Sequence, residues 1–241
     1  GSVYLKIKIN LLKKPNKKGE HMKTVSVLGM AHDMHETIFK DYYALSDAEK
    51  VIKTFKPDVI LAELWPDKDY KDYDQLPDFK LEYKKLIFPL AQSLKFKVIP
   101  VDYASSMFIE GFKKWEKEKK TLVDLGDVKE KLFNKIDHMI FSELPGMFTS
   151  AKELNSEASN DILQALMDMD RLWFFKNHPE FDFWEQHNEE NYKHIMKAIR
   201  ESNHQRFLIT FGLQHKYWFE RRLKEEKDII FEHITKYCDE N

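Results

Sequence analysis

The stretch RFLITFGLQHKYW, residues 206–218, decides the fold that we expect for the whole chain. Its first half is apolar or β-favouring and leads into Gly212, and its second half changes to the helical spacing of Tyr217, Trp218 and Leu223. This change of period predicts a buried strand, a tight turn and then a helix. His215 follows the turn directly, at the start of the expected helix.

The same pattern occurs once before, in TVSVLGMAH at residues 24–32, where Gly29 is followed after two residues by His32. The chain has only 7 glycines in 241 residues, which is about 3% where roughly 7% is usual. Glycine lets a chain turn sharply at the end of a strand. Since ligands of open α/β sheets bind beyond the carboxyl ends of the strands, we expect both histidines to face a ligand site.

The composition is that of a globular protein with a substantial core, since 42% of the residues are hydrophobic and 14% are aromatic. A formal net charge of −2, with lysines mixed among glutamates, gives no reason to expect a nucleic-acid partner. The single cysteine, Cys238, excludes a disulfide or a cysteine zinc site within one chain. No apolar run reaches the length of a bilayer span and no signal-peptide core is recognisable, so we expect a cytoplasmic protein without a membrane partner.

Strand and helix patterns alternate from Met22 onward. The expected strands are residues 24–28, 58–64, 97–103, 206–212 and 228–234. A helix is expected after the capping-box pattern of Ser46 and Glu49, and another near residues 83–94, where Pro89 predicts a kink. This alternation predicts an α/β fold with a central, mostly parallel sheet flanked by helices.

Residues 105–200 carry helical patterns and almost no strand signal. We therefore predict a single α/β domain over residues 22–241, with a large helical insertion that caps the carboxyl edge of the strands. Residues 1–21 are interpreted as an N-terminal extension that is not native. Lys17 to Met22 can be encoded by a purine-rich stretch followed by ATG, which resembles a ribosome-binding site read in frame, so we expect translation to start at Met22.

Two acidic residues fall at the ends of expected strands. Glu63 lies in the apolar run VILAELW, where burial of a carboxylate costs several kcal/mol unless it is paired, hydrogen-bonded or bound to a metal. Asp102 ends the third strand, where it could orient a neighbouring group or simply cap the next helix. If the register is right, both meet His32 and His215 at one edge of the sheet.

This set of residues permits two kinds of chemistry. Two neutral imidazoles and a carboxylate with an open position suit a hydrolytic metal centre, with His32, Glu63 and His215 as ligands and His35 as a further one. Without a metal, one histidine could act as a general base that a carboxylate orients. The remaining histidines are interpreted as helix-surface or boundary residues, namely His138, His178, His187, His194, His204 and His233.

Two Gly-x-x-His motifs after strands, a glutamate in the second strand and a mostly helical middle together resemble the TraB/Tiki superfamily, which also includes erythromycin esterase-like and ChaN-like proteins. The resemblance covers most of residues 22–227 and rests on four motifs: GMAH (Gly29, His32), AEL (Glu63), VDY (Asp102) and GLQH (Gly212, His215). It implies a metal-dependent protease, a hydrolase that uses histidine and glutamate, or a haem binder.

The chain departs from this family pattern in one place. The resemblance implies an Arg-Asn pair on the helix before the last motif, but the chain has HNEEN there, with His187-Asn188 or Glu190-Asn191 in its stead. A cation that stabilises an oxyanion would then have to come from Arg171 or Arg200. For Arg171, an ion pair with Asp168 or Asp170 is the simpler expectation.

These observations predict a hydrolase that acts on an ester or amide bond of a small molecule or peptide. His32, Glu63, His215 and Asp102 are the expected catalytic residues, and a divalent metal ion is the expected cofactor of the metal-dependent form. The alternatives are a non-enzymatic binder that uses the same histidines for haem, and an inactive member of the family.

Overall fold

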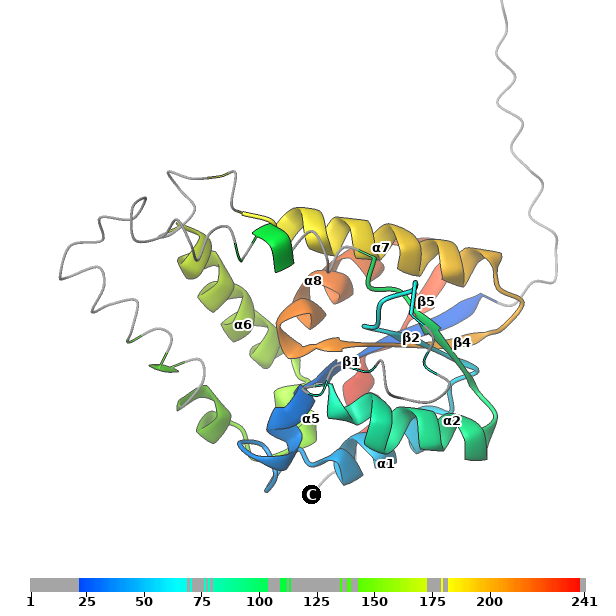
Figure 1. Cartoon of the computed structure of the whole chain (residues 1–241), viewed down its shortest axis with the longest axis horizontal. Helices are drawn as coiled ribbons and strands as arrows, with labels where there is room; N and C mark the ends of the chain where they lie inside the picture. The colour runs from blue at the N-terminus through cyan, green and yellow to red at the C-terminus, as the bar shows by residue number, and fades with distance from the viewer. Residues whose placement is uncertain are drawn as a thin grey trace, which may run out of the picture.

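The computed structural model describes residues 22–68, 80–103, 143–172 and 182–238, together with residues 70, 76, 78, 109–111, 113, 135, 138, 139 and 179. The expected N-terminal extension, residues 1–21, lies outside the described residues, and so does His178. A parallel sheet forms the centre of the described part, with helices on both of its faces (Figure 1).

The sheet has five parallel strands in the order β3-β2-β4-β1-β5. The strands are β1 (Lys23–Met30), β2 (Val59–Ala62), β3 (Lys97–Pro100), β4 (Arg206–Gly212) and β5 (Ile229–Phe231). The predicted α/β class with a mostly parallel sheet is therefore confirmed. In the sequence β4 comes after β1, β2 and β3, but in the sheet it lies between β2 and β1. The two strands that lead into the Gly-x-x-His motifs are therefore neighbours.

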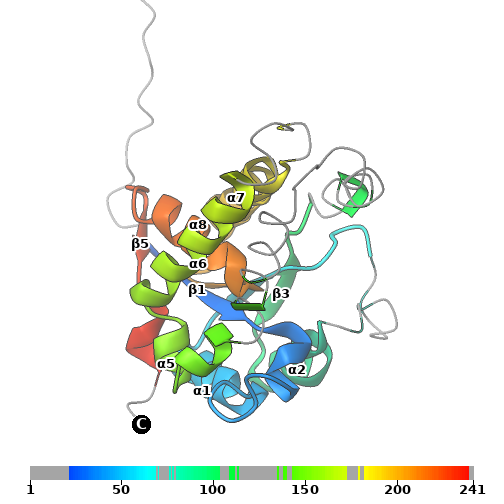
Figure 2. The same ribbon diagram turned by 90° about the vertical axis from the view of Figure 1, so that its left-hand side faces the viewer.

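Helices cover the two faces of this sheet in separate groups. The helices α1 (Leu45–Phe55) and α2 (Phe88–Leu94) lie on one face, whereas α7 (Trp184–Glu201) and α8 (Leu213–Leu223) lie on the other (Figure 1). Figure 2 shows α6 (Glu157–Asp170) beside α8, and the short α5 (Ala151–Leu154) near α1. The short helices η1 (His32–Glu36), η2 (Tyr83–Ile87), η4 (Leu144–Met147) and η7 (Ile234–Tyr237) complete the described elements.

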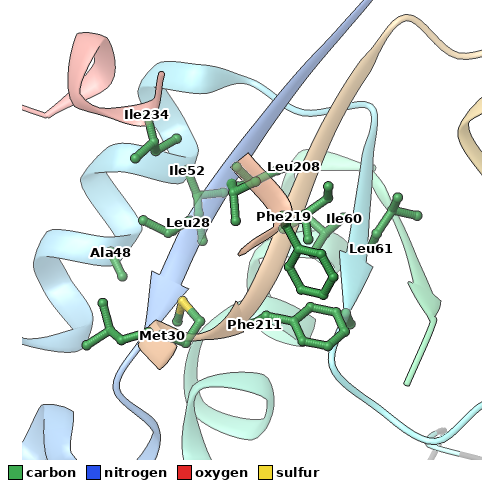
Figure 3. Packing of buried hydrophobic residues seen from close by; sticks show 14 of the residues in the cluster. Leu28, Met30, Ala48, Ile52, Ile60, Leu61, Leu208, Phe211, Phe219 and Ile234 are labelled. Atoms are coloured by element: carbon green, nitrogen blue, oxygen red, sulfur yellow. The ribbon is translucent and has the colours of Figure 1, made fainter. Parts of the chain in front are cut away.

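Both faces of the central strands are buried, which explains their nearly continuous apolar sequences. On the face covered by α1, Leu28 points toward Ala48 and Ile52 (Figure 3). On the opposite face, the rings of Phe211 and Phe219 meet edge to face with their centroids 4.9 Å apart. This packing joins β4 to α8 and fixes the strand-turn-helix unit that carries His215.

The start of α1 differs from the sequence expectation, and the helix near Pro89 is irregular. The helix α1 begins at Leu45, and the Asp47 carboxylate accepts a hydrogen bond from the Ala44 N–H at 3.0 Å, so Ser46 and Glu49 do not form the predicted capping box. Near Pro89 the helix contains the π-helical turn η2 directly before α2, and Pro89 lies in the first turn of α2. The kink predicted at Pro89 stays a prediction.

The described part of residues 105–200 is helical, as predicted. The helix α7 does not simply cover the strand ends, because it lies along one face of the sheet before β4, in the place of an ordinary crossover helix (Figure 1). Its first two turns extend to the carboxyl edge and supply residues described below. Of the remaining predicted cap, residues 143–172 form η4, α5 and α6, and most of residues 105–142 and 173–181 lie outside the described residues.

The first motif needs Gly29 for close packing, not for a special backbone conformation. A Cβ atom at Gly29 would lie 2.6 Å from Leu213 Cδ2 and 3.1 Å from Lys216 Cδ. The close packing of α8 on β1 therefore depends on the missing side chain.

Among the described residues, no helix has both the length and the apolar character that crossing a lipid bilayer requires.

Candidate active site

Four neighbouring strands end at the same edge of the sheet, and each end presents one of the residues singled out from the sequence. His32 follows β1, Glu63 follows β2, Asp102 follows β3 and His215 lies in the first turn of α8 after β4. The backbone of His32 has a φ angle of 54°, a left-handed conformation that histidine adopts more readily than most residues. The structure thus brings these four residues to one edge.

Gly212 lies at the base of this site, between the side chains that come from the strand ends. A Cβ atom built on it would lie 3.0 Å from His32 Nε2, 3.6 Å from Glu63 Oε2 and 3.7 Å from His215 Cδ2. Three side chains from three strand ends therefore surround one point above a glycine. The second Gly-x-x-His motif needs its glycine because any side chain there would enter the space between the two histidines.

The Glu63 carboxylate is buried and both of its oxygens are held. Lys80 Nζ donates to Oε1 at 2.8 Å, and the Gly212 N–H donates to Oε2 at 2.6 Å. The Glu63 N–H donates to Tyr83 Oη at 2.8 Å, which fixes the backbone as well. Although burial disfavours the charged form, the Lys80 ammonium holds the pKa of Glu63 well below its usual range. Glu63 is therefore a fixed anion.

His32 lies between two carboxylates. Its Nδ1 is 2.8 Å from Glu82 Oε1, and its Nε2 is 3.7 Å from Glu63 Oε2. Burial opposes protonation, but the hydrogen bond to Glu82 and the two negative charges outweigh it and raise the pKa of His32 above 6.5. The side chain is 19% exposed, so the ring remains accessible to a ligand. These surroundings favour the imidazolium form of His32.

His215, unlike His32, lies in an environment that disfavours protonation of its ring. Its ring stacks on Trp184 with the centroids 4.5 Å apart, and burial lowers its pKa to about 3. Its Nδ1 is 2.7 Å from Asn188 Oδ1, while Asn188 Nδ2 donates to the Trp184 carbonyl oxygen at 3.0 Å. Because the amide oxygen can only accept, Nδ1 carries the proton and Nε2 keeps a lone pair. His215 is therefore a neutral base of defined tautomer.

Asp102 connects the carboxyl edge to α7. Its Oδ1 accepts a hydrogen bond from Asn191 Nδ2 at 3.0 Å and lies 3.3 Å from His187 Nε2. The His187 ring in turn meets the His215 ring edge to face, with the centroids 5.1 Å apart. Asp102 thus contacts His187, which packs against His215. The helix that Asp102 could cap, from Ser105 onward, begins outside the described residues, and the predicted role of Asp102 as an orienter stays a prediction.

Comparison with known proteins adds no relative. The chain matches no protein-family model, no curated protein and no solved structure. The resemblance to the TraB/Tiki superfamily therefore stays a prediction that rests on the four motifs alone.

His35 is brought to the same edge but is held by backbone atoms. The Ala31 N–H donates to His35 Nε2 at 2.9 Å, and His35 Nδ1 donates to the Tyr43 carbonyl oxygen at 2.7 Å. Burial lowers the pKa of His35, so the ring is neutral and accepts at Nε2. Both ring nitrogens are thus engaged in shaping the turn after β1, and we do not propose His35 as a metal ligand.

The sequence interpretation missed several residues of this site. His187 is 3% exposed and contacts Asp102, so its assignment to a helix surface is wrong. Lys80, Glu82 and Asn188 were not singled out as partners of the motif residues, although each contacts one directly. Lys80 and Glu82 come from a segment without a motif, since a loop sets their spacing to the strands, whereas Asn188 lies in the HNEEN segment that was compared with the Arg-Asn pair.

The two arginines considered as a cation for the site lie elsewhere. Arg171 pairs with Asp182 at 2.8 Å and with Glu185 at 3.0 Å, and the expected partner Asp168 adds a further negative charge nearby. The side chain of Asp170, the other expected partner, is not among the described ones. Arg200 Nη2 is 2.7 Å from Glu226 Oε2, on an exposed surface. The cation found at the site is Lys80, which belongs to the segment before η2.

The arranged residues do not fit the metal centre considered from the sequence. Within the described part of the chain, no group of three or more His, Cys, Asp or Glu side chains is arranged to hold a metal ion. The reason lies in the donor set, because Glu63 Oε1 contacts an ammonium and Glu63 Oε2 contacts an N–H. A positively charged Lys80 at 2.8 Å from the expected carboxylate ligand would repel a second cation.

Proposed function

We propose that this protein is a hydrolase of ester or amide bonds that uses its two histidines as a general base and a general acid. The observation that carries the proposal is the pair of opposite pKa shifts on His215 and His32, whose rings face the same point above Gly212. Two titratable groups whose environments push their pKa values apart are the usual sign of acid and base roles.

His215 is the proposed base. Its neutral ring lies with Cδ2, the carbon bonded to Nε2, 3.7 Å from a Cβ atom built on Gly212, and Asn188 holds the tautomer in which Nε2 can accept a proton. In the first step, Nε2 takes a proton from water while the water oxygen adds to the substrate carbonyl carbon. The nearby Glu63 anion favours the imidazolium that forms.

His32 is the proposed acid. Its Nε2–H gives a proton to the leaving oxygen or nitrogen as the bond to the carbonyl carbon breaks, which yields a carboxylic acid and an alcohol or amine. His215 then loses its extra proton to solvent and His32 regains one, so that the cycle closes. Glu82 supports this role, because its contact with Nδ1 at 2.8 Å holds the ring and favours its charged form.

The two other functions considered from the sequence have less support. Metal-dependent hydrolysis would require Glu63 to exchange the Lys80 and Gly212 donors for a metal. For haem binding, His215 would be an axial ligand, but its ring stacks on Trp184 and the residue is only 8% exposed. Haem titration with optical detection and metal analysis of the purified protein test these two alternatives.

We expect the purified protein to hydrolyse activated esters such as p-nitrophenyl acetate, with a dependence on pH that reports both histidines. The active form has His215 neutral and His32 protonated. As pH rises through the pKa of His32, which is above 6.5, kcat/KM falls because the acid is lost. On the acidic side, kcat/KM stays level until His215 gains a proton, near its pKa of about 3, or until the protein unfolds.

The measurement is kcat/KM against pH for wild type and for His32→Gln. In the variant the alkaline fall should disappear together with most of the activity. A wild-type rate that instead rises through the alkaline range would mean that His32 acts as the base, and would contradict the assigned roles. If a panel of esters and amides shows no activity above the buffer rate, the proposed function is wrong.

A further inference from the structure

Lys80 makes an unusual set of contacts for a lysine. Its Nζ donates to the Glu63 carbonyl oxygen at 2.7 Å and to Glu63 Oε1 at 2.8 Å, and it lies 3.8 Å from Asp102 Oδ2. The side chain is only 6% exposed. Two carboxylates and a carbonyl therefore converge on one buried ammonium.

This donor set is the kind that binds hard cations. Carboxylate and carbonyl oxygens are the ligands that Mg²⁺, Mn²⁺ and Ca²⁺ prefer in proteins. Asp102 Oδ2 is buried and makes no hydrogen bond, so the ammonium of Lys80 is the cation that faces it. The oxygens come from the ends of β2 and β3, so their positions are set by the sheet and not by Lys80 itself.

We propose that Lys80 is a built-in cation that occupies an oxygen-lined cation site between Glu63 and Asp102, and that removing its ammonium converts this place into a binding site for a divalent metal. Lys80 is thus a positioning residue, because it holds the Glu63 carboxylate, whose Oε2 lies 3.6 Å from a Cβ atom built on Gly212. The inference concerns the site of the proposed hydrolase, yet metal binding can be measured whether or not the protein hydrolyses anything.

The negative charges of the site are balanced by nearby cations. Three buried carboxylates, from Glu63, Glu82 and Asp102, lie around the two cations Lys80 and His32. Buried carboxylates without such partners would cost several kcal/mol each. After loss of Lys80, a divalent ion is the partner whose charge and ligand preference match the Glu63 and Asp102 oxygens.

The test is titration of wild type and Lys80→Ala with Mn²⁺, followed by the electron paramagnetic resonance signal of the free ion. We expect Lys80→Ala to bind Mn²⁺ at least roughly tenfold more tightly than wild type, and Mn²⁺ to raise its melting temperature. The double variant Lys80→Ala/Asp102→Asn should lose this binding because it lacks one of the two carboxylates. Lys80→Arg, which keeps a cation, should bind Mn²⁺ no better than wild type.

The matched control is Lys85→Ala. Lys85 belongs to the neighbouring helical turn and pairs with the exposed Glu36 at 2.6 Å, so its removal should leave Mn²⁺ binding unchanged. A folded Lys80→Ala that binds Mn²⁺ no better than wild type would overturn the inference. If Lys80→Ala does not fold, Mn²⁺ binding to wild type still tests the inference. Tight binding to wild type that is lost in Glu63→Gln would mean that the ammonium does not fill the site.

Discussion

Replacement of His215 by glutamine is expected to lower kcat/KM for an activated ester by roughly 100- to 10,000-fold, the usual contribution of a general base. Glutamine can still bond to Asn188, but it offers no basic nitrogen in place of His215 Nε2. Steady-state kinetics at neutral pH, with circular dichroism to confirm the fold, measures the effect.

The matched control is His204→Gln. His204 lies in the turn before β4, at the opposite end of the strands from Gly212, and should leave kcat/KM unchanged. Equal losses in the two variants would mean that the observed activity does not come from this site. A His215→Gln variant that is folded and fully active would remove the proposed base.

The second large effect concerns stability. Glu63→Gln is expected to reduce the free energy of unfolding by about 3 kcal/mol, because it removes the carboxylate that lies 2.8 Å from the buried Lys80 ammonium. Chemical denaturation at neutral pH measures this loss. Since the pKa of Glu63 is lowered, its contribution is present above the unfolded value of 4.5 and is lost as pH falls.

Glu36→Gln provides the control, because it breaks an ion pair of the same residue types on the surface. The Lys85–Glu36 pair has side chains that are 49% and 44% exposed, so its loss should cost less than about 1 kcal/mol. A similar cost for the two substitutions would contradict the view that Glu63 and Lys80 form a buried pair on which the site is built.

The fold could be predicted because the informative signals are local. The change from strand to helix spacing at Gly212, and its repetition at Gly29, located two central strands that prove to be neighbours in the sheet. Residues that directly follow a strand were also predictable, because parallel strands end at a common edge. His32, Glu63, Asp102 and His215 belong to this class, and the structure brings them together.

The partners of these residues were harder to predict, because their positions depend on packing between distant segments. Asn188 contacts His215 only because α7 packs beside α8, and no local pattern specifies that contact. The sequence gives a weak indication that Lys80 is buried. Lys80 precedes Tyr83 by three residues and Ile87 by seven, so it continues the buried face of the helical turn η2. A lysine on an apolar face implies a buried counter-ion.

The central claim is that two histidines at one edge of the sheet are held in opposite protonation states. Nitrogen NMR of histidine-labelled protein, with His215→Gln and His32→Gln used for assignment, tests this claim without a substrate. We predict that His215 stays neutral, protonated at Nδ1, with a pKa of about 3, whereas His32 titrates above 6.5. If both rings titrate together near the ordinary histidine value, or if His215 carries its proton on Nε2, the account is contradicted.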